Sequence, residues 1–504
     1  MAAEPHEISP DSLDDAEARI KEKEKKDQQK KPNNGSGGGG GITSRASQTG
    51  SDITLAEFFI SENGHRTRYI TKWGQWMEYD GIRWKEQETL YIFHQIKELC
   101  KKHAHRQGRN DAAKKQIESN RTISAIEHIV RYDSRIATRV DQWDADLWSI
   151  NTPNGLLDLK TGIVAPHRPD HYVTKVTCAS PEGECPNWMK HLHKVFHNDE
   201  ELIKGFQHAL GYALTGITDE QIFLFCHGKG QVGKTTTIKI VQHIFNDYWQ
   251  NANIETFMMT KNPQHTAELA KLAGARLVTA SETEQGMPLA EARIKMLTGG
   301  DPISARFMRQ NFFTFMPQFL LIIYGNHKPA LRSVDTAMRR RVHMYPFSVY
   351  IPESERDIHF NKILESEANG IMKWILEGCL AWQKEKRLYI PKEVVEATDE
   401  YFSDEDVVMS WIKERVVFTK DLNDGFFSSS AWNDYQLWTA NNREFTQKQK
   451  IFYREIKIKL QDEGLKYNED FHQRVNNKDK KGAGYTGGRL KDQEDPIMPI
   501  KMVK

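Results

Sequence analysis

Eight consecutive residues in the middle of the chain have the types and spacing of a phosphate-binding loop. They are Gly228, Lys229, Gly230, Gln231, Val232, Gly233, Lys234 and Thr235, and Thr236 follows them. The pattern G-x-x-x-x-G-K-[ST] turns backbone N–H groups toward phosphate oxygens. Its lysine reaches the β- and γ-phosphates, and its hydroxyl ligates Mg²⁺. The pattern therefore predicts that this loop, with Thr236, binds ATP and Mg²⁺.

The same glycines also satisfy the dinucleotide fingerprint G-x-G-x-x-G, at Gly228, Gly230 and Gly233. That hypothesis leaves Lys234 and Thr235 unexplained. It also requires an acidic residue at a strand end about twenty residues further on, and no clean candidate stands there. ATP binding is therefore the preferred interpretation.

Two apolar runs of strand length end in polar residues. Arg276–Ala280 runs into Ser281-Glu282-Thr283-Glu284, and Phe319–Tyr324 runs into Gly325-Asn326. In phosphate-loop enzymes an acid after the second strand holds the magnesium-bound water or polarises the attacking water. We expect Glu282 to be that base and to lie at the metal, with Glu284 as the alternative. Asn326 is expected to contact the γ-phosphate or to orient water.

Three arginines, Arg339 to Arg341, directly precede the apolar segment Val342–Phe347. Three adjacent arginines are seldom all buried in a hydrophobic core. They are well suited to present a guanidinium to a phosphate on a neighbouring subunit, as an arginine finger does.

The segment Leu297–Phe313 contains a Gly-Gly-Asp turn followed by alternating apolar residues. This pattern predicts a hairpin with Arg306 and Arg309 near its tip. Such a hairpin could grip a phosphate backbone, and a plain structural hairpin is the alternative.

The elements that must position these residues alternate between strands and helices. Strands are predicted at Ile222–Cys226, Arg276–Ala280 and Phe319–Tyr324, with helices at Ile238–Phe245 and Ala290–Leu297. Short buried strands separated by helices predict an α/β core with a parallel sheet.

Other patterns flank this core on both sides. A hairpin is predicted around Asp80-Gly81, a helix over Leu90–His105, a turn-strand-turn over Asn154–Gly162 and helical structure over Pro186–Leu214. Helical structure also follows Pro346. A basic, aromatic-bearing unit spans Glu393–Lys491, where Trp432, Tyr435 and Trp438 suit a helical core.

The length of 504 residues predicts roughly three domains. We place a disordered arm with a glycine-rich linker at 1–52, an α+β N-terminal domain at 53–200, the ATPase domain at 201–390 and a C-terminal domain with its tail at 391–504. With 70 basic and 69 acidic residues the net charge is +1, so the net charge gives no indication of nucleic-acid binding. A local basic patch could still bind nucleic acid.

Five cysteines without a Cys-x-x-Cys pair argue against a disulfide framework or a zinc ribbon. No apolar run is long enough to span a bilayer. We therefore expect a soluble protein in a reducing compartment, with no membrane partner. His191, His193 and His197 stand near Cys178 and Cys185, but their spacing fits no standard zinc pattern, so we interpret them as ordinary helix histidines.

The order of these motifs resembles that of superfamily 3 helicases. More closely, it resembles the C-terminal helicase part of phage and plasmid primase–helicases of the satellite-phage type, which are related to the poxvirus primase–helicase. Beyond the loop and the arginines, the matching segments are Asn154–Leu159, Gly211–Gly216, Ser281–Glu284 and Lys295–Asp301.

The resemblance implies an AAA+-like ATPase that forms a hexameric ring on DNA, with ATP at subunit interfaces. By motif position, Lys234 and Thr235 would bind nucleotide and magnesium, and Asn326 would be the sensor. Arg341, with Arg340, would be the finger acting in trans, and Arg309 would lie near the tip of a DNA-tracking hairpin. The region before Gln221 resembles the poxvirus-type N-terminal domain, and Glu393–Lys491 resembles a winged-helix-like tail.

Two departures from the family pattern matter. The usual adjacent acidic pair is replaced by Ser281-Glu282-Thr283-Glu284, so which acid is the base stays open. A primase catalytic domain would normally precede this region, and only the polar arm does. We therefore expect no primer synthesis by this chain and a separate primase as a candidate partner.

The expected function is that of an ATP-dependent replicative helicase of a phage, plasmid or integrated element, acting on single-stranded and forked DNA in the bacterial host cytoplasm. The alternative is an origin-recognition protein in which Glu393–Lys491 reads duplex DNA and ATP controls assembly. A small-molecule kinase would not account for the arginine cluster or the large flanking domains.

Overall fold

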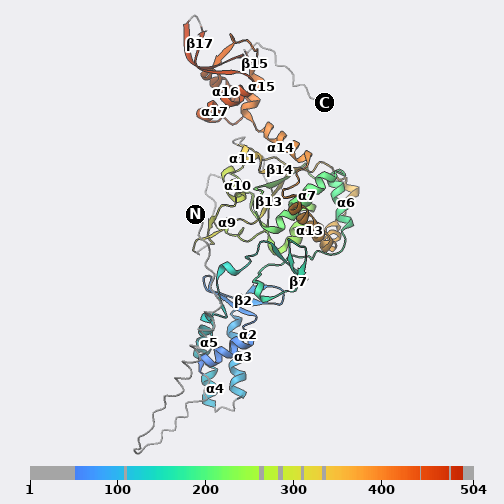
Figure 1. The fold of residues 1–504 in the computed structure, drawn as a ribbon, viewed down its shortest axis with the longest axis vertical. Coiled ribbons are helices and arrows are strands. Elements are labelled where there is room, and N and C mark those ends of the chain that lie inside the picture. The colour runs from blue at the N-terminus through green and yellow to red at the C-terminus, as the bar shows by residue number, and fades with distance from the viewer. Residues whose placement is uncertain are drawn as a thin grey trace, which may run out of the picture.

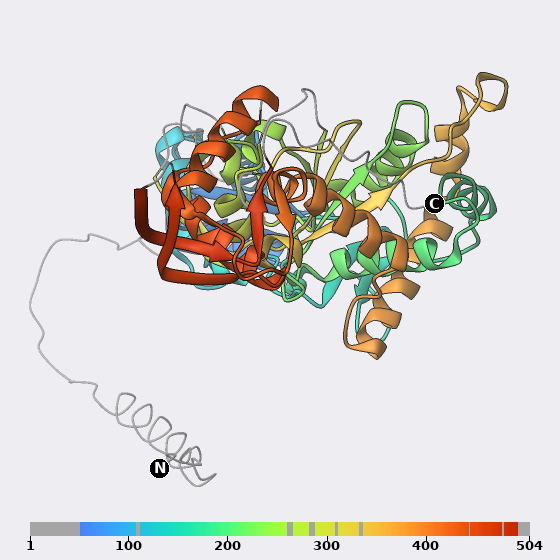
Figure 2. The same ribbon diagram turned by 90° about the horizontal axis from the view of Figure 1, so that it is seen from above.

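The computed structural model describes residues 51–106, 111–259, 266–281, 288–307, 311–331, 336–442, 444–475 and 478–491. Along its long axis these residues form an N-terminal unit, a middle unit around a parallel sheet, and a C-terminal unit (Figure 1). Viewed along that axis, the C-terminal unit covers one side of the middle unit and leaves the helices on the other side uncovered (Figure 2). Residues 1–50 of the arm predicted at 1–52 lie outside the described residues, while Ser51 caps α2 and Asp52 is its first residue.

The N-terminal unit packs four helices beside a small sheet. The helices are α2 (Asp52–Asn63), α3 (Tyr91–Arg106), α4 (Asp111–Ile117) and α5 (Asn120–Tyr132). The sheet has the order β3-β2-β1-β4, with β1 (Thr67–Ile70), β2 (Gln75–Tyr79), β3 (Trp84–Glu86) and β4 (Ala137–Thr138). The antiparallel pair β2–β3 confirms the predicted hairpin, and α3 confirms the helix predicted over Leu90–His105.

A three-stranded sheet and two helices connect this unit to the parallel sheet. They are β5 (Ser149–Thr152), β6 (Gly155–Asp158), β7 (Val164–Ala165), α6 (Pro186–Val195) and α7 (Glu200–Thr215). The helical stretch predicted over 186–214 is therefore broken. His197 and Asn198 have φ of 56° and 59°, which no α-helix accommodates, and the Asp199 carboxylate then caps α7 by accepting from two backbone N–H groups.

Five parallel strands form the centre of the middle unit, in the order β14-β8-β13-β10-β9. They are β8 (Phe223–His227), β9 (Trp249–Asn251), β10 (Leu277–Ser281), β13 (Leu320–Gly325) and β14 (Val342–Pro346). The predicted parallel sheet is confirmed, and each of its three predicted strands begins one residue later than expected. The helices α8 (Lys234–Phe245) and α10 (Glu291–Thr298) confirm the two helices predicted between the strands. A short helix, α9 (Thr266–Ala270), precedes β10, and α11 (Thr336–Arg339) precedes β14.

The two faces of this sheet are buried in different hydrophobic clusters. Alternate residues of β8 illustrate this, because Leu224 belongs to the cluster with α7, α8 and α13 (Ala368–Glu385), whereas Phe225 belongs to the other. The short helix α12 (Phe360–Ser366) precedes α13. Helix α14 (Lys392–Asp404) contributes Tyr401 and Phe402 to the second cluster. The hydrophobic cluster of the C-terminal unit thus begins at Val408 rather than near residue 391.

The C-terminal unit combines three helices with short sheets. It contains α15 (Val407–Arg415), β15 (Val416–Phe418), β16 (Gly425–Phe427), α16 (Ser428–Asn442), α17 (Gln449–Asp462), β17 (Lys466–Val475), β18 (Lys478–Thr486) and β19 (Gly488–Leu490). Tyr435 is buried and stacks on Phe452 at a ring-centroid distance of 4.4 Å, while Trp432 and Trp438 pack at the edge of the same cluster. The predicted aromatic core is therefore confirmed. In the described part of the chain, no helix combines the length and the apolar character needed to cross a bilayer.

Candidate functional site

The phosphate loop connects the carboxyl end of β8 to the first residue of α8, Lys234. Gly233 has φ of +83°, and a Cβ there would lie 2.5 Å from a methyl carbon of Val195, so a glycine is required. A Cβ at Gly228 would collide with the carbonyl oxygen of Phe347, while at Gly230 it would meet nothing within 4 Å. The base of the loop is thus packed against protein, and its crest is open to a ligand.

The Lys234 amine lies inside this loop. It donates to the carbonyl oxygens of Gly228 and Lys229 and to Oδ1 of Asn326, at 3.2 Å for the last. The side chain is buried, and that burial lowers the pKa of its amine. Asn326 directly follows β13, whose last residue pairs with His227 of β8. The structure therefore brings together the lysine and the amide that the sequence placed 92 positions apart.

A pocket of about 690 Å³ opens beside the loop. One wall is the loop and the start of α8, where the Thr235 side chain is exposed to the opening. A second wall comes from α6, through Lys190, His191 and Lys194. A third is the segment after β14, residues 351–361, which brings Ile351 and Phe360. A pocket with cationic groups and apolar surface beside a phosphate loop suits a nucleotide, and its volume is in the range of small-molecule sites.

His191 supports this site from α6. Its Nε2 lies 2.8 Å from Oγ1 of Thr237, and that hydroxyl donates to the carbonyl oxygen of Gly233. Because the hydroxyl hydrogen is used, His191 must donate through Nε2–H. Burial lowers the pKa of His191 to about 4, so the ring is neutral at pH 7. The contact fixes the first turn of α8, and among the described residues no three His, Cys, Asp or Glu side chains are placed to hold a metal ion.

The walls of this pocket carry no sequence motif, which is why sequence reasoning missed Lys190, His191, Ile351 and Phe360. The spacing of His191 from Trp188 and Leu192 places the three on one helix face, and this was the sequence pattern that could have indicated a buried histidine. The two candidate bases, Glu282 and Glu284, lie outside the described residues. The described part of that strand ends at Ser281, which pairs with Tyr324 of β13.

The arginine cluster lies at the amino end of the parallel strands, opposite the end that carries the phosphate loop. It precedes β14, whose first residue, Val342, pairs with the first residue of β8. The five residues of β8 separate this end from the phosphate loop by about 16 Å, more than an arginine side chain spans. The cluster therefore does not reach the phosphate loop of its own chain.

The three arginines differ in environment. Arg339 is exposed and forms an ion pair with Asp399 at 2.6 Å. Arg341 is only 7% exposed and donates to the carbonyl oxygen of Ala337 at 2.7 Å and to Oε1 of Gln221 at 2.9 Å. Arg340 is exposed and donates to the same Gln221 oxygen at 3.2 Å. Of the two predicted finger residues, Arg340 is thus the accessible one.

The predicted basic hairpin is confirmed by the antiparallel pair β11 (Ile303–Ala305) and β12 (Phe313–Phe315). Arg306 follows β11 and lies over the ring of Phe312, 4.7 Å from its centroid. Phe312 is 58% exposed and Phe307 is 40% exposed. Arg309 lies outside the described residues. The described part of the tip therefore presents one cation and two aromatic rings to solvent.

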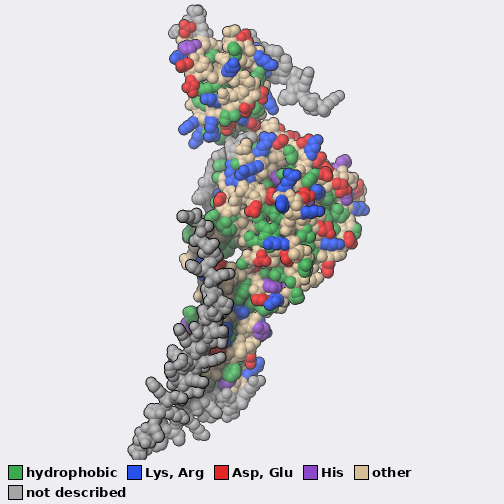
Figure 3. Space-filling model, in the orientation of Figure 1, with side chains coloured by type: hydrophobic (Ala, Val, Ile, Leu, Met, Phe, Trp, Pro, Cys, Tyr) green, Lys and Arg blue, Asp and Glu red, His purple; other side chains and the backbone are tan. Residues whose placement is uncertain are grey.

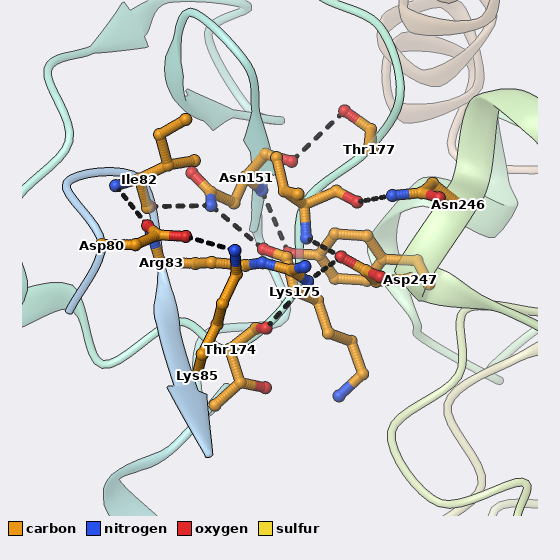
Figure 4. A network of polar contacts seen from close by, with 12 residues as sticks. Asp80, Ile82, Arg83, Lys85, Asn151, Thr174, Lys175, Thr177, Asn246 and Asp247 are labelled. Carbon is orange, nitrogen blue, oxygen red and sulfur yellow. Dashed lines mark hydrogen bonds and ion pairs between the residues drawn. The ribbon is translucent and has the colours of Figure 1, made fainter. Parts of the chain in front are cut away.

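A polar network joins the N-terminal unit to the end of α8 (Figure 4). Arg83, beside the β2–β3 turn, forms an ion pair with Asp247, whose carboxylate also accepts from the N–H of Val176 at 3.0 Å. Asn151 donates to the carbonyl oxygens of Ile82 and Lys175. The helix that begins at the phosphate loop therefore ends at a junction with the N-terminal unit.

Two family models match the chain. The model "D5 N terminal like" matches residues 56–197, and a "Family of unknown function (DUF5906)" matches residues 226–341, nearly the whole segment from the loop to the arginine cluster. The solved structure titled "The apo structure of NrS-1 C terminal region (305-718)" covers 87% of this chain and 99% of its own, with 12% identity and a TM-score of 0.47. Because this TM-score is below 0.5, we draw no conclusion from this similarity.

The relatives of known name are viral. The chain is 22% identical over 420 residues to "Putative helicase L207/L206" of Acanthamoeba polyphaga mimivirus, covering 73% of this chain and 43% of that protein. It is 26% identical over 241 residues to "Putative helicase V13" of Sputnik virophage, covering 44% and 31%. It is 26% identical over 165 residues to "Primase D5" of fowlpox virus, covering 31% and 20%.

The chain spans less than half the length of each of these relatives. Their names nevertheless agree with the D5-type match and with the motif order of the loop-to-arginine segment. The chain is thus similar to proteins of the primase–helicase family.

Proposed function

We propose that this chain is the ATP-driven motor of a superfamily 3 replicative DNA helicase. The observation that carries the proposal is the meeting of Lys234, Thr235 and Asn326 at the mouth of the 690 Å³ pocket. Support also comes from the parallel sheet, because inserting β13 between β8 and β10 is what places Asn326 beside the loop. This arrangement is consistent with an AAA+-like core.

In this proposal the loop N–H groups and Lys234 bind the triphosphate, while Ile351 and Phe360 contact the base. Thr235 would hold Mg²⁺, which when bound would supply positive charge beside the phosphates. Asn326 orients the attacking water, and Glu282 or Glu284 accepts its proton. The open crest at Gly230 supports this fit, because it leaves the loop accessible to phosphate oxygens.

We further propose that the site is completed by a second copy of the chain in a ring, with a hexamer as the expected state. The 16 Å separation within β8 supports this, because an arginine of the cluster can act only on a neighbour's phosphate. We assign the finger to Arg340 and assign to Arg341 the structural role of bonding Gln221 and Ala337. This revises the order of preference that the family resemblance implied.

The hairpin β11–β12 is the proposed contact with single-stranded or forked DNA, through Arg306 and Arg309. The C-terminal unit, with α15–α17 and the β17–β18 hairpin, is proposed to be winged-helix-like. Figure 3 shows Lys and Arg side chains gathered on the side of this unit where α17 lies. A separate primase is a candidate partner. We propose that the motor acts in replication of a viral or mobile-element genome, by unwinding rather than by origin recognition, and the helicase names of the viral relatives support this.

The test is ATP turnover and strand separation by the full chain. Wild type should hydrolyse ATP and unwind a forked duplex, whereas Lys234→Ala should do neither while remaining folded by circular dichroism. Lys239→Ala is the matched control and should keep both activities, because Lys239 is an exposed lysine of α8 that does not line the pocket. Wild-type protein that neither hydrolyses ATP nor unwinds forks would refute the proposal.

A further inference from the structure

A second pocket, distant in the chain from the phosphate loop, lies in the C-terminal unit and has a volume of about 440 Å³. It is formed by the end of β16, the first turn of α16, one side chain of α17, and β17 with β18. Its lining residues are Phe427, Ser428, Ser429, Ser430, Tyr453, Tyr467, Lys480, Lys481, Gly482, Ala483 and Tyr485. We refer to it as the Tyr–Lys pocket.

The charge of the Tyr–Lys pocket is positive. None of its lining residues is acidic, and the first turn of α16 contains no acid either. Among the residues that the structure describes, Lys480 is exposed and forms no ion pair. Lys481 pairs with Asp470 at 3.1 Å, but the two side chains are 58% and 74% exposed, so the pair is weak and exchangeable. Two ammonium groups are therefore available to an anion.

Hydroxyl groups lie beside these lysines. Ser429 and Ser430 are exposed, and Ser428 is hydrogen-bonded to Tyr485 at the floor of the pocket. Serine hydroxyls and lysine ammoniums are the side chains that contact phosphate oxygens of nucleic-acid backbones. The lysine–serine side of the pocket thus has the chemistry of a phosphate site.

The opposite side is aromatic. Tyr453 of α17 and Tyr467 of β17 are both half-buried, so each keeps part of its ring accessible. The amine of Lys457 lies 3.9 Å from the centroid of the Tyr467 ring, which orders that ring. Half-buried tyrosines beside lysines form the kind of platform on which unpaired bases stack.

We propose that the Tyr–Lys pocket binds single-stranded nucleic acid, with one phosphate on Lys480, Lys481 and the serines and one base on the tyrosines. A single strand is required because a base inside a duplex is already stacked and paired and cannot enter. The site goes beyond the proposed motor. It is a second contact with the strand, separate from the β11–β12 hairpin and independent of ATP.

The experiment measures binding of a fluorescein-labelled dT12 oligonucleotide to the full chain by anisotropy, without nucleotide, at several salt concentrations. Lys480→Ala/Lys481→Ala should weaken binding at least tenfold and reduce the salt slope by about 0.7, the contribution of the one phosphate contact that the two lysines share on a single strand. Tyr453→Ala should weaken binding at least fivefold, the lower limit for loss of one stacked base, and leave the salt slope unchanged.

The matched control is Lys413→Ala/Lys466→Ala, which removes two exposed lysines of the same unit that do not line the pocket. It should change neither affinity nor slope. Unchanged binding in the pocket variants, an equal loss in the control, or an equal loss on a blunt duplex would overturn the proposal. Because ATP is absent, failure of the motor proposal would appear in turnover assays and not in these measurements.

Discussion

Substituting the two arginines of the predicted finger one at a time tests where the nucleotide site is completed. Arg340 is exposed and makes one hydrogen bond, at 3.2 Å, whereas Arg341 is buried and makes two shorter ones. If Arg340 is the finger, Arg340→Ala should lower ATP turnover by 10³–10⁵, which corresponds to about 4–7 kcal/mol of activation free energy. Its free energy of unfolding should change by less than about 1 kcal/mol.

Arg341→Ala should instead lower the free energy of unfolding more than Arg340→Ala does. Its removal leaves the Ala337 carbonyl without this donor, whereas Gln221 keeps the hydrogen bond from Arg340. Arg341→Ala should therefore lower the free energy of unfolding by about 1–3 kcal/mol, measured by urea denaturation. Arg339→Ala is the control, because its exposed ion pair with Asp399 contributes little to stability.

Mixing inactive variants tests the action in trans. An equal mixture of Lys234→Ala and Arg340→Ala should regain up to about one quarter of wild-type turnover, because that share of randomly formed head-to-tail interfaces pairs an intact lysine with an intact arginine. The reasoning fails if folded Arg340→Ala keeps turnover within about threefold of wild type. It also fails if co-assembled mixtures regain no activity.

Two further predictions concern pH and DNA. Burial lowers the pKa of His191 and of His343 to about 4, so both are neutral in the folded chain, and the stability they retain above pH 6.5 is lost as the pH falls toward 4. At pH 5.5 each of the two histidines should lower the free energy of unfolding by about 1.4 kcal/mol relative to pH 7.5. Urea denaturation of wild type and His343→Leu at both pH values checks this. An equal pH dependence of the two proteins would contradict it. Arg306→Ala should weaken single-strand binding and lower the salt slope by about 0.7 without changing DNA-independent ATP turnover, and an unchanged slope would remove the hairpin contact.

Three of the five strands of the parallel sheet, β8, β10 and β13, could be predicted because each is a buried apolar run whose burial on both faces leaves a continuous pattern. The short strand β9 is only partly buried and carries no such run. The loop residues could be predicted because their chemistry fixes their spacing. That Asn326 meets Lys234 depended on the strand order, since polar residues at strand ends meet only if the strands are neighbours. No local pattern shows that β13 lies between β8 and β10.

What could not be predicted depends on contacts between distant segments. The pocket walls at Lys190 and Phe360 come from a helix before β8 and from the first residue of α12 after β14, and neither carries a motif. Similarly, Arg340 and Arg341 are adjacent in sequence, and only the position of Gln221 decides which side chain is buried. In the same way, no local pattern shows that α14 packs on the parallel sheet, where its Thr398 accepts a hydrogen bond from the N–H of Met344 in β14.

Helix α8 connects the phosphate loop at its start to the N-terminal unit beyond its end. Its first residue, Lys234, bonds Asn326 inside the loop, and its first turn is fixed by His191 through Thr237. Its twelve residues form a rod of about 18 Å, and Asp247, two residues beyond it, is bonded to Arg83. A rigid helix transmits displacement from end to end, because its backbone hydrogen bonds resist bending. A movement of α8 along its axis would therefore displace Asp247 relative to Arg83 unless the N-terminal unit moved with it.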